Sequence, residues 1–275
     1  MVFLFDIIKT IILGIIQGIT EWLPISSTGH LILFNQIWQL SMKPEVFEVF
    51  KVVIQFGSIL AVLFLYFNKL NPWAKGKSPA KQKETFRLWI NVIIGCIPAG
   101  IVGVLLDDII EGYLSAEFVI AITLIAYGII FILMAKHPKT PTINSLNELT
   151  PKSSLKIGCF QCLALIPGTS RSGATILGGL QTGCSRYVAS EFSFFIAIPV
   201  MAGASLLKIV KFFIKGNLFT FSQVFLILLG TVVSFIVSLF AIRALLNYVR
   251  NHDFSVFGWY RIVLGILVIL FFYVL

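Results

Sequence analysis

Two polar clusters interrupt strongly apolar sequence, and this pattern constrains the fold more than any other feature of the chain. The first occupies residues 17–30 and contains Glu21, His30 and three consecutive hydroxyl residues. The second occupies residues 167–175 and contains Arg171 among four hydroxyl residues. A charged side chain at membrane depth costs about 3 kcal/mol, so such residues are rare there and mark functional sites. Both clusters are therefore candidate parts of a binding or catalytic site.

The surrounding sequence is that of an all-α integral membrane protein. Of its 275 residues, 58% are hydrophobic and 12% are charged, about half the charged fraction of a soluble domain. A membrane-spanning helix needs roughly 17–25 mostly apolar residues, so the shorter uncharged runs must extend into flanking positions. The sequence predicts about six spans in a single membrane domain, at 52–68, 88–106, 118–135, 192–207, 216–242 and 262–275.

The positive charges gather in two loops. Six Lys or Arg residues lie within 69–87 and four within 136–156, whereas 106–118 holds four carboxylates and no cation. The positive-inside rule places both basic loops in the cytoplasm and the acidic loop outside. This placement accounts for the net charge of +9 without nucleic acid as a partner. Three lysines at 208, 211 and 215 lie on the outer side in this topology and are an exception to the rule.

The two halves of the chain share a pattern. Gly14-x-x-Gln17 matches Gly158-x-x-Gln161, and the Pro24 cluster matches the Pro167 cluster at nearly the same offset. We expect two repeats, at 1–140 and 150–275, each with three spans. An odd number of spans per repeat inverts the second copy, as in many transporters with a site at the repeat interface.

Each polar cluster breaks a segment that is too short on either side to cross a bilayer comfortably. Pro24 and Gly29 interrupt the first, and Pro167-Gly168 interrupts the second. Irregular backbone at membrane depth is tolerated where it is buried or lines a cavity. We therefore expect two re-entrant helical hairpins that approach from opposite faces and meet at their broken tips.

The second tip has the composition of a phosphate site. Thr169 or Ser170 can cap a helix running from Arg171 to about Leu180, and free backbone N–H groups at a helix start attract anions. Arg171 and Thr175 share a face of that helix, and an arginine can bind phosphate through two parallel hydrogen bonds. We expect Ser170, Ser172 and Thr175 to assist in binding. The alternative is that Arg171 only neutralises Glu21 or Glu191.

The first tip carries groups suited to nucleophilic catalysis. Ser26 or Ser27 can cap a helix from Thr28 to about Gln36, which places Ser27 and His30 on one face. A serine needs a base to remove its proton, and His30 or Glu21 could serve. The hydroxyls of Ser26 and Thr28 are further candidate ligands of the substrate. The alternative for His30 is an interior histidine with a purely structural role.

Glu21 has three candidate roles at this tip. It could act as a general acid or base, as a ligand of a divalent cation, or as the counter-ion of Arg171. Gln17 lies one helical turn earlier, so it can orient Glu21 or bind a substrate oxygen. A flippase that moves lipid phosphates between leaflets could use the same pocket, but it would need no activated serine.

Four motifs also carry a family resemblance, which covers essentially the whole chain. They are Gln17-x-x-x-Glu21, Leu23-Pro-Ile-Ser-Ser-Thr-Gly-His30, Gly158-Cys-Phe-Gln-Cys162 and Pro167-Gly-Thr-Ser-Arg-Ser-Gly-Ala-Thr175. With them the chain resembles the undecaprenyl-diphosphate phosphatase family associated with bacitracin resistance. The resemblance implies a multi-pass enzyme of the bacterial cytoplasmic membrane whose active site opens outward. It also implies a polyprenyl diphosphate substrate and recycling of the lipid carrier for peptidoglycan synthesis.

The same resemblance implies roles for individual residues. Glu21 matches the family's essential acidic residue, and Ser27 matches its proposed nucleophile, with His30 as rival or assistant. Ser170, Arg171 and Thr175 match its phosphate-binding residues. The family accepts Glu or Gln at position 17, and this chain has Gln. A divalent cation, Mg²⁺ or Ca²⁺, would then be held by Glu21 and the diphosphate, and no organic cofactor is expected.

Overall fold

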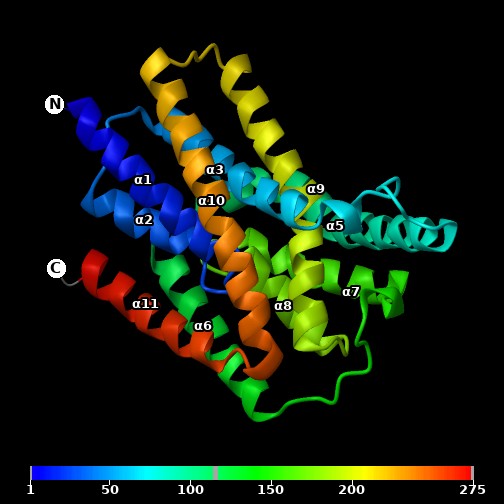
Figure 1. Cartoon of the computed structure of the whole chain (residues 1–275). Coiled ribbons are helices and arrows are strands. Elements are labelled where there is room, and N and C mark those ends of the chain that lie inside the picture. Colours follow the sequence, from blue (N-terminus) through cyan, green and yellow to red (C-terminus); the bar gives the residue numbers. More distant parts are fainter. Residues whose placement is uncertain (1, 114–116, 274–275) are drawn as a thin grey trace.

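The computed structural model describes residues 2–113 and 117–273, and the regular secondary structure of this part of the chain consists of helices and one isolated β-bridge (Figure 1). The α-helices, in order, are α1 (Val2–Thr20), α2 (Ser27–Ile37), α3 (Pro44–Leu65), α4 (Phe67–Leu70), α5 (Pro79–Tyr113), α6 (Glu117–Lys136), α7 (Pro151–Gln161), α8 (Arg171–Gln181), α9 (Arg186–Ile214), α10 (Phe221–Asn251) and α11 (Ser255–Tyr273). Two short 3₁₀ helices, η1 (Leu146–Glu148) and η2 (Cys162–Leu165), precede and follow α7. This architecture confirms the predicted all-α membrane class.

Seven of these helices are long and apolar enough to cross a membrane, one more than the sequence predicted. They are α1, α3, α5, α6, α9, α10 and α11. The additional helix is α1, whose candidate span is Phe3–Thr20. The sequence count omitted it because Asp6 and Lys9 shorten its uncharged part to residues 10–20, which were expected to form half of the first re-entrant hairpin. In the structure Lys9 Nζ lies 3.6 Å from an Asp6 oxygen, and this pairing offsets both charges.

The two short helices α2 and α8 begin at the broken tips in the same way. Ser26 and Ser170 are the N-caps, and their hydroxyls accept hydrogen bonds from the backbone N–H of Gly29 and Gly173. Their φ angles are 72° and 71°, the two positive values among the described non-glycine residues. This backbone region is uncommon for a side-chain-bearing residue, and such strain gathers at functional sites. The structure thus selects Ser26 and Ser170 from the predicted pairs of caps.

Close helix packing buries the tips at the centre of the molecule. In Figure 1, α8 lies behind the long diagonal helix α10, and α6 and α11 run side by side. Gly128 of α6 and Gly258 of α11 face one another, and a Cβ at either would lie 2.7 Å from the other's carbonyl oxygen. Small residues permit this approach between membrane helices. All residues of α8 from Ser172 to Gly179 are buried, so the second tip is enclosed by protein.

Candidate active site

The two polar clusters meet through a buried ion pair. Arg171 of α8 places its NH2 group 2.9 Å from Glu21 Oε1, across 150 residues of sequence. Glu21 is 4% exposed and the Arg171 side chain 12% exposed. The counter-ion role predicted for Glu21 is therefore present in the structure. A buried pair of this kind is stable when further hydrogen bonds satisfy both partners.

The second carboxylate oxygen of Glu21 collects three donors. Gln17 Nε2 lies 2.8 Å from Oε2, Ser27 Oγ lies 3.0 Å away, and Gln55 Nε2 of α3 lies 3.3 Å away. Gln17 thus orients Glu21, one of the two roles that its spacing predicted. Because an ionised carboxylate only accepts hydrogen bonds, Ser27 must donate its proton toward Glu21. This contact makes Glu21 the candidate base for Ser27.

His30 is engaged elsewhere. Its Nδ1 lies 2.7 Å from the Ser26 carbonyl oxygen, and its Nε2 lies 2.7 Å from the hydroxyl of Tyr260 on α11. The carbonyl only accepts, so Nδ1 carries the proton and Nε2 accepts one from Tyr260. The two rings stack with centroids 5.6 Å apart. Both nitrogens of His30 are therefore occupied away from Ser27, although the two residues share one face of α2.

Arg171 is held by several groups besides Glu21. Its NH1 donates to the Ser193 carbonyl of α9 at 2.9 Å, and its guanidinium carbon lies 5.5 Å from the centroid of the Trp22 ring. Its Nε is buried and has no hydrogen-bond partner among the described residues. Thr175 supports the same region, with its hydroxyl oxygen 2.6 Å from that of Ser193. One donor of the arginine is thus left unsatisfied inside the protein.

The remaining hydroxyl residues fasten the tips together. Ser172 Oγ lies 3.0 Å from the backbone carbonyl oxygen of Glu21 and 3.2 Å from that of Leu23. Ser170 Oγ, besides capping α8, lies 3.2 Å from Ser172 Oγ. Ser26 is 1% exposed and caps α2, and Thr28 is half-buried on that helix. In this arrangement Ser172 joins the tips, and Ser26 and Ser170 hold the helix starts.

The sequence analysis missed a second buried arginine. Arg261 of α11 is fully buried and donates to the carbonyl oxygens of Pro24 at 3.1 Å and Gly168 at 2.9 Å. It also lies 3.5 Å from the Thr123 carbonyl oxygen. A single cation beside the apolar run 262–275 was the available signal in the sequence. Its position shows that it joins the two broken tips from behind.

Three further residues at the site were missed for a similar reason. Gln55 and Ser193 are isolated polar residues within spanning helices, and such residues usually face the protein interior. Trp22 is fully buried and packs edge-on against Phe194, with ring centroids 5.1 Å apart. Its place beside Glu21 in the sequence was the only signal.

The residues at the site do not fit a metal ion held by the protein alone. No group of three His, Cys, Asp or Glu side chains comes together in the described chain. Glu21 contributes the carboxylate, and Gln17 offers a buried amide oxygen without a hydrogen-bond partner. One carboxylate and one amide are too few ligands for Mg²⁺ or Ca²⁺, which take six or more oxygens.

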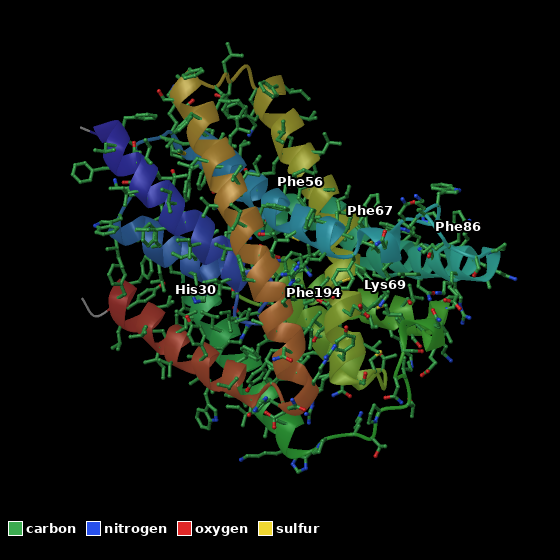
Figure 2. The ribbon with its side chains drawn as sticks, viewed as in Figure 1. His30, Phe56, Phe67, Lys69, Phe86 and Phe194 are labelled. Carbon is green, nitrogen blue, oxygen red and sulfur yellow. The ribbon has the colours of Figure 1, made fainter. Side chains whose placement is uncertain are left out.

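An apolar groove of about 410 Å³ runs from the bilayer-facing surface to His30. It lies between α1 and α11, where Figure 2 places His30 facing α11. Its walls are Ile15, Ile16, Ile19, Thr20, Leu23, Ile25, His30, Val256, Phe257 and Tyr260. Ile19 and Val256 are 40% and 49% exposed at its outer edge. The groove therefore connects a lipid-facing surface with the first polar tip.

Comparisons with known proteins agree with this combination of features. The family model described as "Bacitracin resistance protein BacA" matches residues 10–267. The chain is 54% identical to the undecaprenyl-diphosphatase of Lactobacillus delbrueckii subsp. bulgaricus, over 96% of both chains. It is 51% identical to that of Enterococcus faecalis, over 95% of both chains. It is 52% identical to undecaprenyl-diphosphatase 1 of Clostridioides difficile, over 99% of this chain and 98% of the other. This multi-pass integral membrane protein therefore belongs to the BacA family of bacitracin resistance proteins.

Proposed function

We propose that this protein hydrolyses undecaprenyl diphosphate to undecaprenyl phosphate and inorganic phosphate, the activity named for its relatives. The observation that carries the proposal is the contact of Ser27 with Glu21, which also pairs with Arg171. A nucleophile, a base and a phosphate-binding cation thus meet at one buried point. The product would return to peptidoglycan synthesis as its lipid carrier, and removal of the diphosphate would confer bacitracin resistance.

The terminal phosphate would lie between the starts of α2 and α8. Both helices begin at the tips, so their N-terminal N–H groups and positive dipole ends point at the same region. Arg171 would turn one or both of its NH groups from protein acceptors to phosphate oxygens. Phosphoryl transfer depends mainly on such positioning and charge stabilisation.

The proposed reaction has two proton-coupled steps, and the contact of Ser27 with Glu21 supports the first. Glu21 takes the proton of Ser27 as Oγ forms a bond to the terminal phosphorus. The bond between that phosphorus and the bridging oxygen then breaks, and undecaprenyl phosphate leaves with the electron pair and receives the proton. In the second step Glu21 takes a proton from water, which attacks the phosphoserine. Ser27 leaves with its electron pair, is reprotonated by Glu21, and inorganic phosphate is released.

The apolar groove supports a lipid substrate. An isoprenoid chain in the groove would stay among Ile15, Ile19 and Val256 while its diphosphate reached the tips past His30 and Tyr260. The substrate is amphiphilic, and a passage that changes from apolar to polar along its length suits such a molecule. In this arrangement His30 and Tyr260 contact the lipid side of the diphosphate.

We also propose that the chain is a single membrane domain built from two inverted repeats, 1–140 and 150–275. The helices that follow the tips, α2 and α8, both have eleven residues, and the Ser26 and Ser170 caps share one backbone conformation. An offset of 144 residues relates these helices and caps as well as Gly14 and Gly158. The matched positions support duplication of one unit.

Contacts near the helix ends support re-entrant hairpins from opposite faces. Lys9 of α1 donates to the Gln39 carbonyl at 2.7 Å, so the chain after α2 returns to the end of the molecule where α1 starts. Lys139 lies 2.7 Å from Gln181 at the end of α8, near the loop that leads into α7. The first hairpin would enter from the outer side of the bacterial cytoplasmic membrane and the second from the cytoplasm. Glu21 and Ser27 would then open outward.

Asn91 of α5 supports the sidedness. Its amide donates at 3.0 Å to the carbonyl of Leu149, and Arg87 of the first basic loop donates to the same carbonyl at 3.4 Å. The two loops predicted to be cytoplasmic therefore lie at the same end of the molecule. At the other end Lys208 lies 3.5 Å from Glu48, which balances one of the three lysines that broke the positive-inside pattern.

Phosphate release by the purified protein tests the proposal. Wild-type protein should release phosphate from undecaprenyl diphosphate, and Ser27→Ala should not. A trapped phosphoenzyme that survives acid would identify phosphoserine, whereas an acid-labile one would transfer the nucleophilic role to His30. Absence of release by folded wild-type protein would contradict hydrolysis. Movement of a non-hydrolysable lipid diphosphate across liposomes would then support the flippase alternative.

A further inference from the structure

A second and larger cavity, of about 620 Å³, lies at the end of the molecule where α6 and α10 end and α9 and α11 begin (Figure 1). It is separate from the site described above, because none of its walls belongs to either tip. Its walls include the segment 137–141 after α6 and the residues 183–187 that lead into α9. The first of these segments belongs to the basic loop 136–156, which places the cavity on the predicted cytoplasmic side.

Cations predominate around the cavity. Lys139, Arg186 and Arg250 line it, with Asp253 as the only carboxylate among its walls. None of these three cations takes part in an ion pair within the described chain. Arg250 lies over the ring of Tyr187, 5.3 Å from its centroid, which orients the guanidinium without neutralising it. An excess of positive charge therefore faces this space.

The carboxylate of Asp253 is hydrogen-bonded to Ser255. It accepts hydrogen bonds from both the backbone N–H and the hydroxyl of Ser255, where α11 begins. These bonds, and to a smaller extent the charge of nearby Arg186, lower the pKa of the Asp253 carboxyl. The carboxylate stays ionised and helps to hold the start of α11, but one negative charge does not balance three cations.

The rim of the cavity is fixed by backbone hydrogen bonds. Thr142 N–H donates to the carbonyl of Gly183 at 2.9 Å, and Ser185 N–H donates to the carbonyl of Ile143 at 2.8 Å. These bonds fasten the segment after α6 to the turn between α8 and α9. The backbone that carries Lys139 and Arg186 is therefore already ordered, so binding would cost little backbone conformational entropy.

The interior of the cavity is apolar beneath the cations. Phe131, Met134, Leu180 and Phe254 are part of its walls. A free inorganic anion would gain nothing from these side chains, whereas a phosphate attached to a glycerol and acyl chains would contact both parts. Basic pockets between helices on the cytoplasmic side of membrane proteins are typical sites for anionic lipid headgroups.

We infer that this cavity binds the phosphate headgroup of an anionic membrane lipid, through Arg186, Arg250 and Lys139. Binding would join α6, α9, α10 and α11 at their cytoplasmic ends. It is independent of catalysis at the tips, so it stands whether or not the proposed hydrolysis is correct.

Thermal unfolding of the full-length protein in neutral detergent tests this inference. Phosphatidylglycerol should raise the unfolding temperature of the wild type, and phosphatidylcholine should not. Arg186→Gln and Arg250→Gln should each reduce the shift. The two variants are made separately, because either one still tests the inference if the other does not fold. Arg243→Gln is the matched control, because Arg243 is an exposed arginine of α10, the helix that carries Arg250, and it does not line the cavity. It should retain the full shift.

Two more measurements test the role of charge in the cavity and distinguish a lipid headgroup from free phosphate. Asp253→Asn removes the one negative charge and should strengthen phosphatidylglycerol binding, measured as the lipid concentration for half of the shift. Inorganic phosphate should produce no comparable shift at matched concentration. A phosphatidylglycerol shift that survives both arginine substitutions would overturn the inference, and so would an equal shift with phosphatidylcholine. An equal effect of inorganic phosphate would overturn the assignment to a lipid.

Discussion

Glu21 and Arg171 join the two broken tips by a contact of 2.9 Å, although they lie 150 residues apart in sequence. The pair is enclosed by α3, α8 and α9, and three uncharged donors satisfy the other oxygen of Glu21. Removing one partner of a buried pair leaves an uncompensated charge and costs about 3–5 kcal/mol. The pair therefore contributes to both the geometry of the site and its chemistry.

Replacement of Glu21 by Gln should reduce hydrolysis strongly. The amide keeps the shape but cannot accept the proton of Ser27, and loss of a general base lowers rates by about 10²–10⁴-fold. Phosphate release at saturating substrate measures the effect. Gln55→Met is a suitable comparison, because it removes a longer hydrogen bond to the same oxygen and should cost far less. Equal rates for Glu21→Gln and wild type would exclude Glu21 as the base.

We predict that the residue at position 17 controls how strongly phosphate release responds to a divalent cation. Gln17→Glu would place a second carboxylate one helical turn before Glu21, and paired carboxylates favour Mg²⁺ or Ca²⁺. We expect a steeper stimulation of phosphate release by added cation in this variant than in the wild type. Gln17→Met should show no added stimulation. Identical cation titrations for Gln17→Glu and the wild type would show that this position plays no part in metal binding.

Arg261 should prove essential for the arrangement of the tips. Arg261→Met leaves the carbonyls of Pro24 and Gly168 buried without this donor, and each such group costs about 1–3 kcal/mol. We expect a lower unfolding temperature and a lower turnover rate. Arg261→Lys retains the charge but not the forked donor, so it should recover stability only in part. Wild-type stability in Arg261→Met would contradict the role assigned to this residue.

Features that depend on local sequence patterns could be predicted, whereas contacts made by residues from distant helices could not. Six of the seven candidate spans and the starts of α2 and α8 follow from local patterns of apolar residues and caps, whereas the Glu21–Arg171 pair was one of several alternatives that the isolated charges allowed. Gln55, Ser193, Tyr260 and Arg261 reach the site from distant helices, and no local spacing relates them to the tips. His30 is held away from Ser27 by the Ser26 carbonyl and by Tyr260, which contacts the imidazole from α11.

The groove can be tested with substrates of different chain length. Ile19→Trp should fill its outer edge and raise the KM for undecaprenyl diphosphate, because the isoprenoid chain would lose its place. Hydrolysis of a short-chain diphosphate should stay close to the wild-type rate. Ile8→Trp adds the same side chain to an exposed position of α1 outside the groove and should affect neither substrate. Parallel loss of activity toward both substrates in Ile19→Trp would contradict a groove for the chain.

Helix packing around the site should be sensitive to one methyl group at Gly57 of α3. A Cβ there would overlap the backbone carbonyl oxygen of Thr231 on α10, and neither backbone can move without shifting a spanning helix. Overpacking of this kind costs about 1–3 kcal/mol, so Gly57→Ala should lower the unfolding temperature. Gly203 of α9 is the matched control, since no atom lies within 4 Å of a Cβ added there. Gly203→Ala should be neutral or slightly stabilising, because alanine favours helix over glycine. Equal unfolding temperatures for the two variants would contradict the close contact between α3 and α10.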